Sequence, residues 1–350
     1  MAQNEDRGRC IKAGELAVVV GAGRSGKAAA RLLLRQGARV RLLESNPQAL
    51  DEAQAAALRA EGIELVLGDQ GPELFAGAKL VVPSPGLPVV RLREMMGPHA
   101  DAEGTEILAE MELAWRALDG EPVLAVTGTS GKTTTVSLAA AMLREQGLRV
   151  FLGGNIGTPL LPRVSEMKPE DLAVVELSSF QLMGMKHSPH VAAITNLTPN
   201  HLDYHKDFDE YVQAKTAIYR SQKDGDRLIL NLDDEVTRTL HASGNLFCTS
   251  KNQELANGVF LKDDIIYITE GGARRELMNQ NDIRIPGAHN VYNMMMAAAI
   301  VQGYASDDDI RAVATTFGGV EHRIEFVREK DGVKYYNDSI ASSPTRTIAG

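Results

Sequence analysis

One segment constrains the fold of this chain more than any other: residues 127–134 read T-G-T-S-G-K-T-T and lie between an apolar run, Val123–Val126, and a helix expected over Lys132–Gln146. A glycine-rich loop between a strand and a helix directs backbone N–H groups at phosphate oxygens, while its lysine reaches the β- and γ-phosphates and its hydroxyl can bind Mg²⁺. The strict spacing of such loops would place glycine at Val126, so the match is to a shortened form. We therefore predict a nucleotide site formed by Gly128, Thr129, Ser130, Gly131, Lys132, Thr133 and Thr134.

A second glycine-rich loop, Gly21–Gly26, reads G-A-G-R-S-G and joins the apolar run Leu16–Val20 to a helix expected over Gly26–Gln36. Its glycines permit a tight turn and let a diphosphate approach the helix N-terminus, and Glu44 ends the next expected strand, where an acid binds ribose hydroxyls. Taken alone, this pattern is typical of an NAD site. The same pattern also occurs as a strand–turn–helix connection without a ligand.

Short β-branched runs alternate with alanine- and leucine-rich stretches along the first two-thirds of the chain, which is the pattern of an α/β protein with mostly parallel sheets. At roughly 150 residues per domain, the 350 residues correspond to about two domains with part of a third. We expect a Rossmann-like domain over residues 1–118, a P-loop ATPase-like domain with a mostly parallel sheet over residues 119–326, and the start of a third α/β domain over residues 327–350. Further strands are expected at Arg39–Leu43, Lys79–Val82, Arg149–Leu152, Leu172–Glu176 and Val191–Thr195, and further helices at Thr105–Ala117 and Phe208–Ser221.

The last segment is the basis for the third domain. Val333–Tyr336 is expected to form a strand, and Ser343-Pro344 then supplies an N-cap and a first helical residue shortly before the sequence ends. These residues would begin a β–α unit, but no expected sheet is available for its strand to join. We therefore expect a chain that is cut at the start of a third domain and is inactive on its own. The alternative is a tail folded against the second domain.

The composition excludes several classes of protein. Lysine and arginine number 37 against 46 acids, and the net charge of −9 disfavours non-specific binding to nucleic acid or to an anionic membrane. The longest apolar run, Met294–Val301, is far shorter than the ~20 residues that span a bilayer. Two cysteines, Cys10 and Cys248, form neither a disulfide framework nor a metal pattern. We therefore expect a globular cytoplasmic protein that neither binds nucleic acid nor inserts into a membrane.

Several polar residues follow the ends of expected strands. Glu176 ends one such strand, where a carboxylate beside a phosphate loop is placed to bind magnesium, although a solvated acid would also fit there. His201 and Asp203 follow the next strand and reach the same edge of the sheet. By itself, Lys215 is typical of an exposed helix lysine. The remaining polar segments, taken alone, are a helix cap and polar loops at residues 285–293, 321–323 and 337–339.

Taken together, these segments occur in the order found in the Mur ligases, as G-T-S-G-K-T-T, G-G-N-I-G, V-V-E-L-S-S-F-Q-L, N-L-T-P-N-H-L-D, Y-V-Q-A-K, P-G-A-H-N-V-Y-N, H-R and N-D-S. Over essentially its whole length the chain therefore resembles this family of ATP-dependent amide-forming enzymes of peptidoglycan precursor synthesis. The G-A-G-R-S-G loop, Glu44 and Ser84-Pro85-Gly86 are most similar to the members that add D-glutamate to UDP-N-acetylmuramoyl-L-alanine. In those members the glycine loop holds the UDP of a sugar nucleotide.

The resemblance implies a reaction in which the L-alanyl carboxylate attacks the γ-phosphate of ATP and the amine of D-glutamate then displaces phosphate from the acyl phosphate. The catalytic residues that it implies are Lys132, Glu176, His201 and Lys215. ATP would be bound by the 128–134 loop together with Asn290, Asn293, Arg323 and Asp338. The UDP-sugar would be bound by Gly21, Gly23, Arg24, Ser25, Gly26, Glu44, Ser84, Gly86 and Asn155.

The resemblance also implies two Mg²⁺ ions. Thr133 and Glu176 would bind the first, and His201 and Lys215 the second. A protonated lysine would repel a cation, but the family carbamylates this residue with CO₂, and the carbamate is an anion. One position departs from the family pattern, because Ile340 stands where many relatives carry a lysine that helps to handle the incoming amino acid.

Other functions compete with this interpretation. A sister ligase for another amino acid, or a folylpolyglutamate synthetase, would share the central domain but would explain the Gly21–Gly26 loop, Glu44 and Ser84-Pro85-Gly86 less well. An NAD-dependent oxidoreductase follows from the Gly21–Gly26 loop alone but leaves the 127–134 loop unexplained. A non-catalytic nucleotide-binding module is the third alternative. For the ligase we expect a monomer whose partners are UDP-N-acetylmuramoyl-L-alanine, ATP and D-glutamate.

Overall fold

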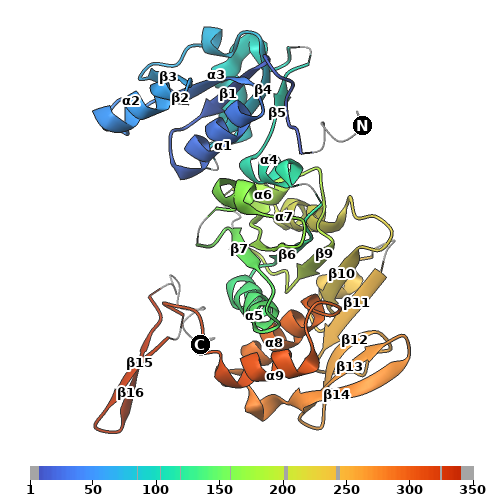
Figure 1. Cartoon of the computed structure of the whole chain (residues 1–350). Coiled ribbons are helices and arrows are strands. Elements are labelled where there is room, and N and C mark those ends of the chain that lie inside the picture. The colour runs from blue at the N-terminus through green and yellow to red at the C-terminus, as the bar shows by residue number, and fades with distance from the viewer. Residues whose placement is uncertain are drawn as a thin grey trace. The chain divides into compact units, whose positions relative to one another are not determined.

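The computed structural model describes residues 8–84, 86–102, 104–118, 120–157, 159–200, 204–241, 245–323 and 325–339. The chain divides into two compact units. The first contains Met1–Glu121, Thr158–Pro169 and Met183–His187, and the second contains Pro122–Gly157, Glu170–Leu182 and Ser188–Gly350. Each unit has its own sheet (Figure 1). The α/β class and the mostly parallel sheets are confirmed, while the domain boundaries at residues 118 and 326 stay predictions.

The first unit is built on five parallel strands in the order β3-β2-β1-β4-β5. The chain leaves β1 toward β2 on one side and later returns to β4 on the other, so the strand order reverses between β1 and β4. In such sheets ligands bind at the carboxyl ends of the strands beside this reversal. The strands are β1 (Leu16–Val20), β2 (Arg39–Glu44), β3 (Glu64–Leu67), β4 (Ala78–Pro83) and β5 (Glu106–Ile107). The helices are α1 (Arg24–Arg35), α2 (Glu52–Ala60), α3 (Val89–Met96) and α4 (Glu110–Ala117), with 3₁₀ turns η1 (Pro72–Phe75), η2 (Gly97–His99) and η3 (Leu161–Glu166).

The central strand of this unit shows why the sequence folds in this way. All five residues of β1 are buried, because a parallel strand covered on both faces is apolar throughout. Helix α1 buries a face of small and aliphatic side chains that includes Ala29, Ala30 and Leu33. The helix expected over Thr105–Ala117 is shorter than predicted, because Glu106 and Ile107 pair with β4 as an edge strand and α4 begins at Glu110.

The large sheet of the second unit has nine described strands in the order β14-β13-β12-β11-β10-β9-β6-β8-β7, of which β13 and β14 are antiparallel. The strands are β6 (Val123–Thr127), β7 (Val150–Gly154), β8 (Leu172–Glu176), β9 (Val191–Ile194), β10 (Arg227–Asn231), β11 (Asn245–Ser250), β12 (Gly258–Lys262), β13 (Ile265–Glu270) and β14 (Ala273–Asn279). The helices are α5 (Lys132–Glu145), α6 (Ser179–Met183), α7 (Phe208–Thr216), α8 (Ala288–Ile300) and α9 (Asp307–Thr316), with 3₁₀ turns η4 (Ala217–Tyr219), η5 (Thr237–Thr239) and η6 (Gln280–Asp282).

The core of this unit lies between the sheet and helices α5, α8 and α9, which pack together beside it (Figure 1). Residues Met294–Ile300 of α8 are all buried there. Because β6 lies between β8 and β9, the ends of these three strands meet at one edge. No described helix combines the length and the apolar character needed to cross a membrane.

A two-stranded antiparallel hairpin follows, made of β15 (Glu325–Lys330) and β16 (Val333–Asn337). The strand expected at Val333–Tyr336 is therefore present, and the predicted boundary at residue 326 falls inside β15. Apolar side chains on both strands are about half exposed, among them Phe326 and Tyr336. The predicted helix start at Ser343-Pro344 and the departure at Ile340 lie outside the described residues.

Candidate active site

The phosphate loop of the second unit runs from the end of β6 to the start of α5. Gly128 and Gly131 have φ angles of 141° and 82°, which L side chains rarely adopt. A Cβ atom at Gly128 would collide with the Thr195 hydroxyl, and one at Gly131 would collide with the Asn293 side-chain oxygen. The backbone therefore requires glycine at both positions, and the predicted strand–loop–helix context is present.

Two residues at the end of β9 hold this loop in place. The N–H groups of Thr129 and Ser130 donate to the carbonyl and the side-chain oxygen of Asn196, at 2.9 and 3.0 Å. The Ser130 carbonyl accepts from the Thr195 hydroxyl at 2.7 Å and from the Asn196 amide at 3.0 Å. The sequence did not reveal the role of Thr195 and Asn196. They follow β9, which is parallel to β6, so pairing of these two strands would have placed them beside the loop.

Glu176 ends β8 and is only 2 % exposed. Its carboxylate accepts from the Thr133 hydroxyl at 2.7 Å and from the Asn155 amide at 2.9 Å. Thr133 also accepts from the Arg323 guanidinium at 3.2 Å. The solvated-acid interpretation of Glu176 is therefore wrong, because the carboxylate is buried and bonded to the first turn of α5.

These groups fit a magnesium ion. The hydroxyl of Thr133 and the carboxylate of Glu176 are adjacent oxygen donors, which is the ligand type that Mg²⁺ prefers, and substrate phosphates and water complete such sites. Among the residues that the structure describes, no three histidine, cysteine or acidic side chains form a metal cluster.

Lys215 is buried in α7 with 2 % of its surface exposed, so the interpretation of an exposed helix lysine is wrong. Its ammonium donates to the Thr127 hydroxyl at 3.3 Å and lies 4.8 Å from the centre of the Tyr211 ring. Burial lowers the pKa of Lys215 to about 7, with a further lowering from Lys132 and an opposing effect of Glu176. The amine is therefore close to half neutral at neutral pH.

Tyr211 connects this lysine to the phosphate loop. Its hydroxyl lies 3.0 Å from the Thr129 hydroxyl, and its ring packs edge-on against His205. The Nε2 atom of His205 lies 3.0 Å from the Ser179 hydroxyl. From the sequence, Tyr211 was recognised only as the first residue of the Y-V-Q-A-K motif, with no role of its own. The predicted metal ligand His201 and its neighbour Asp203 lie outside the described residues.

The predicted ATP residues of α8 also reach this loop. The Asn293 amide donates to the Asn290 side-chain oxygen at 2.9 Å, and Asn293 in turn accepts from Thr135 at 3.5 Å. The Lys132 ammonium donates to the Thr129 carbonyl at 3.0 Å. Asp338 lies just past β16. The phosphate loop, Glu176, Lys215, Arg323 and the two asparagines thus gather around the start of α5.

The glycine loop of the first unit also requires its glycines. The N–H of Gly21, which has a φ of 99°, donates to the Leu43 carbonyl at 2.7 Å. A Cβ atom at Gly26 would collide with the Gly21 carbonyl, whereas one at Gly23 would meet no atom of the described residues within 4 Å. Ser84 lies against Gly21 and donates its N–H to the Val20 carbonyl at 2.7 Å. The predicted residues Gly21 and Ser84 therefore lie together at the carboxyl ends of β1 and β4.

Two carboxylates adjoin this loop. Glu44 accepts from the Ala22 N–H at 2.8 Å and from the Asn46 N–H at 3.0 Å. Glu110 is bonded to the Ser25 side chain and is 5 % exposed, and among the described residues its Oε1 atom has no hydrogen-bond partner. Burial raises the pKa of Glu110 to about 7, although the Ser25 bond acts in the opposite direction. Sequence reasoning missed Glu110, since nothing local marks it.

Comparison with known proteins assigns the chain to a family. Residues 126–301 match the Mur ligase middle domain, and residues 15–109 match the Mur ligase MurD-like N-terminal domain. The chain is 48 % identical over 344 residues to the UDP-N-acetylmuramoylalanine--D-glutamate ligase of Desulfovibrio desulfuricans, an alignment that covers 97 % of this chain and 73 % of that protein. It is 44 % identical over 334 residues to the enzyme of that name from Acetivibrio thermocellus, with 95 % and 71 % covered.

The chain belongs to the Mur ligase family. Solved structures agree with this assignment at the level of the fold. The MurF structure from Acinetobacter baumannii matches with a TM-score of 0.58 at 19 % identity, covering 98 % of this chain and 68 % of that one. The MurC structure from Thermotoga maritima matches with a TM-score of 0.55 at 19 % identity, covering 96 % and 76 %.

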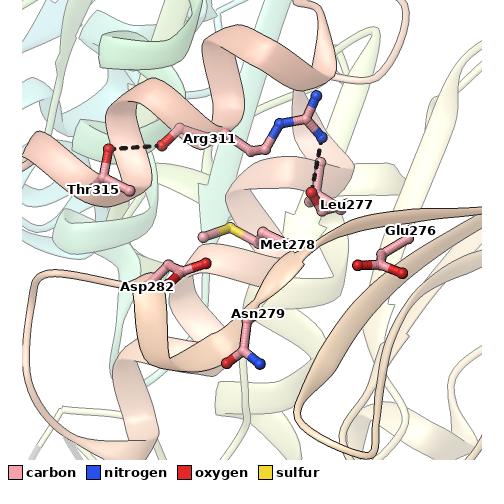
Figure 2. Close-up of a pocket in the computed structure, with 7 residues that line it drawn as sticks. All are labelled: Glu276, Leu277, Met278, Asn279, Asp282, Arg311 and Thr315. Carbon is pink, nitrogen blue, oxygen red and sulfur yellow. Dashed lines mark hydrogen bonds between the residues drawn. The ribbon is translucent and has the colours of Figure 1, made fainter.

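A surface hollow of about 430 Å³ lies elsewhere in the second unit of this Mur ligase, between β14 and α9 (Figure 2). Arg311 crosses it and donates to the Leu277 carbonyl at 2.8 Å. The predicted site residues are not part of its lining, which consists of Glu276, Leu277, Met278, Asn279, Asp282, Arg311 and Thr315. The hollow is therefore separate from the phosphate loop.

Proposed function

We propose that this protein joins D-glutamate to UDP-N-acetylmuramoyl-L-alanine at the expense of ATP, a step of peptidoglycan precursor synthesis. The observation that carries the proposal is the 48 % identity over 97 % of the chain to a ligase of that name. The site agrees with it, because a phosphate loop, a buried carboxylate and a buried amine surround one helix start. The relatives are named as D-glutamate ligases, and the proposal of D-glutamate as a substrate of this chain rests only on the similarity to them.

The chemistry demands this arrangement. A carboxylate is a poor electrophile, so its oxygen first attacks the γ-phosphorus of ATP, and ADP leaves. The amine of D-glutamate then attacks the acyl carbon, loses a proton, and phosphate leaves the tetrahedral intermediate. Two polyanions must meet in the first step. Lys132 and the loop N–H groups would neutralise and orient the phosphates, because phosphoryl transfer depends on positioning and electrostatics.

Thr133 and Glu176 would hold the magnesium ion beside the phosphates. When bound, the ion supplies positive charge that neutralises the phosphate oxygens. Glu176 already lies within hydrogen-bond distance of both Thr133 and Asn155, so its carboxylate is oriented before any ligand arrives. Asn155, predicted to contact the UDP substrate or the phosphates, would act here by orienting Glu176.

Lys215 would carry a carbamate that takes part in holding a second cation together with His201. A lysine with a pKa of about 7 is half neutral at pH 7, whereas at an ordinary pKa less than about 0.1 % is neutral. The neutral nitrogen attacks CO₂, an N–C bond forms, and the nitrogen loses a proton to water. The product is a buried anion beside the phosphate loop.

The Lys215→Ala variant tests this step in the complete protein. We expect it to lose most activity and to regain part of it when a short carboxylate fills the place of the carbamate. Bicarbonate should raise wild-type activity and produce a mass increase on the peptide that contains Lys215. Full activity of the variant without any additive would exclude the carbamate.

The whole proposal is tested by phosphate release from ATP in the complete protein, with UDP-N-acetylmuramoyl-L-alanine and a panel of amino acids. We expect release that depends on D-glutamate. Another preferred amino acid would indicate a sister ligase, and a folate acceptor would indicate a folylpolyglutamate synthetase. Tight NADH binding without UDP-sugar binding would favour an oxidoreductase, and ATP binding without phosphate release would favour a binding module.

A cytoplasmic location and a monomeric state complete the proposal. Two of the three proposed substrates are nucleotides, and the net charge of −9 gives the chain no general attraction to an anionic membrane. Light scattering of the protein at micromolar concentration would measure its mass. A dimer that dissociates neither on dilution nor in salt would contradict the monomer.

A further inference from the structure

A cluster of polar side chains outside the residues discussed so far lies at the ends of β10 and β11. The Asp233 carboxylate accepts from the Ser250 hydroxyl at 2.6 Å, from the Lys251 N–H at 2.6 Å and from the Tyr292 hydroxyl at 2.9 Å. We call these four residues, Asp233, Ser250, Lys251 and Tyr292, the Asp233 cluster. Hydrogen bonds to a charged acceptor are about twice as strong as neutral ones, so the cluster holds its three elements firmly.

Tyr292 and Lys251 of the Asp233 cluster connect it to the beginning of helix α8. Tyr292 lies in its second turn, and the Lys251 ammonium lies 4.8 Å from the centre of the Tyr292 ring. The same ammonium is 3.5 Å from the carbonyl of Ala288, the first residue of α8. Burial and the Asp233 carboxylate together raise the pKa of Tyr292 to about 12, so the phenol keeps its proton and remains a donor.

The same part of α8 carries the asparagines that face the phosphate loop. Asn293 approaches Gly131 so closely that a Cβ atom at Gly131 would have no room. Asn293 is also bonded to Asn290 and to Thr135 of α5. Because an α-helix shifts and rotates as one body, the contacts of Tyr292 determine where Asn290 and Asn293 stand relative to the loop.

We propose that the Asp233 cluster positions the nucleotide: it fixes the first turns of α8 so that Asn290 and Asn293 meet the ATP that the Gly128–Thr134 loop holds. The inference rests on the proposed ATP site. Asp233 and Tyr292 are positioning residues that act through the two asparagines.

The test is Tyr292→Phe in the complete protein, which removes one hydroxyl and keeps the ring. The loss of one hydrogen bond to a carboxylate corresponds to about a 10-fold change in an equilibrium constant. We therefore expect the KM for ATP to rise by roughly 5–10-fold. We expect kcat to stay within about twofold, and the KM for the UDP-sugar to stay unchanged. Calorimetry with Mg-ADP should show the same loss of affinity.

Two further variants keep the test decisive. Tyr304→Phe removes a tyrosine hydroxyl just beyond the other end of α8 and should change no kinetic constant. Lys251→Met keeps the apolar stem over the Tyr292 ring but loses the charge, and it should raise the KM for ATP by roughly two- to threefold. Asp233→Asn keeps one oxygen acceptor and should fall between wild type and Tyr292→Phe.

The outcomes separate this inference from the proposed function. If the wild type binds no Mg-ADP, the ATP site itself is wrong. If the wild type binds it and Tyr292→Phe binds it equally well, the positioning role is overturned. An equal decline of kcat and of every affinity, shared by Tyr304→Phe, would show general destabilisation and would also overturn it.

Discussion

The glycine loops of the two units both join a buried parallel strand to the start of a helix, yet their surroundings differ in charge. The first loop is flanked by two carboxyl groups, those of Glu44 and Glu110. The second is surrounded by Lys132, Lys215 and Arg323, and the buried carboxylate of Glu176 lies beside its Thr133 hydroxyl. Backbone N–H groups alone can hold a phosphate, so under the proposed function it is the neighbouring charges that would distinguish a loop that binds a ligand from one that promotes its reaction.

Each loop also has one buried ionisable neighbour whose pKa is moved to about 7. Burial raises the pKa of the Glu110 acid and lowers that of the Lys215 amine, because in both cases it disfavours the charged form. Glu110 is bonded to Ser25 at the start of α1, and Lys215 to Thr127 at the end of β6. The same physical cause therefore favours the neutral form of the acid behind one loop and the neutral form of the amine behind the other.

The largest effect is expected from Lys132→Ala, which removes a cation from the second loop only. Loss of one preorganised donor to developing charge costs about 10²–10³-fold in rate, so phosphate release by the complete protein should fall by at least that factor. Calorimetric affinity for UDP-N-acetylmuramoyl-L-alanine should not change, since the first loop keeps all its contacts. An equal loss of both properties would abolish the distinction between the loops.

A second contrast lies within the first loop. Gly26→Ala places a methyl group on the Gly21 carbonyl, and such overpacking costs typically 1–3 kcal/mol, so it should lower the melting temperature of the first unit and weaken UDP-sugar binding. Gly23→Ala is the matched control, because its Cβ atom would meet nothing within 4 Å in the described part of the chain. It should leave stability within about 0.5 kcal/mol. A Gly26→Ala protein as stable as the control would refute the packing argument.

The local parts of both loops could be predicted from the sequence. Buried parallel strands are continuous apolar runs, so β1, β6, β8 and β9 were identified, and the glycines were placed by their positions after these runs. Glu176 was correctly expected at a strand end beside the phosphate loop. These features depend on a few neighbouring residues, which is why the pattern was sufficient.

The charged neighbours could not be predicted from spacing. Lys215 has the sequence context of a surface helix lysine, and only the packing of α7 against the end of β6 buries it. A surface helix normally exposes its charged side chains, yet Glu110 and Glu112 of α4 are both buried. The antiparallel pair β13 and β14 was not expected either, because strands at a sheet edge carry a weaker apolar signal. Such features depend on contacts between distant parts of the chain.

The third prediction concerns Glu110 and pH. Its folded pKa of about 7 exceeds the usual 4.5, so the folded state binds more protons between these values, and stability falls as pH rises through this window. Between pH 5 and 8 the wild type should lose roughly 2 kcal/mol of unfolding free energy that Glu110→Gln does not lose. Hydrogen exchange of the β1 and β4 amides measures this difference. Parallel pH profiles of the two proteins would contradict it.

The smallest effect is expected from Glu44→Gln, and it tests whether the carboxylates of the first loop contribute to binding at all. The amide keeps an oxygen that can accept from the Ala22 N–H, but it loses the charge that strengthens this bond. A charged acceptor contributes about 1 kcal/mol more than a neutral one to a hydrogen bond from a ribose hydroxyl, the group that Glu44 is expected to bind, so affinity for the UDP-sugar should fall about fivefold in calorimetry. Phosphate release at saturating UDP-sugar should remain at the wild-type rate, because the second loop is untouched.

The control for this variant is Glu64→Gln, which changes an exposed carboxylate that is paired with Arg41 on the same sheet. Surface ion pairs contribute about 0–1 kcal/mol, and this one lies at the start of β3, whereas the glycine loop adjoins the end of β2. It should therefore leave UDP-sugar affinity unchanged. If Glu44→Gln and Glu64→Gln behave alike, Glu44 only braces the Ala22 turn, and the first loop binds its ligand through backbone N–H groups without help from side-chain charge.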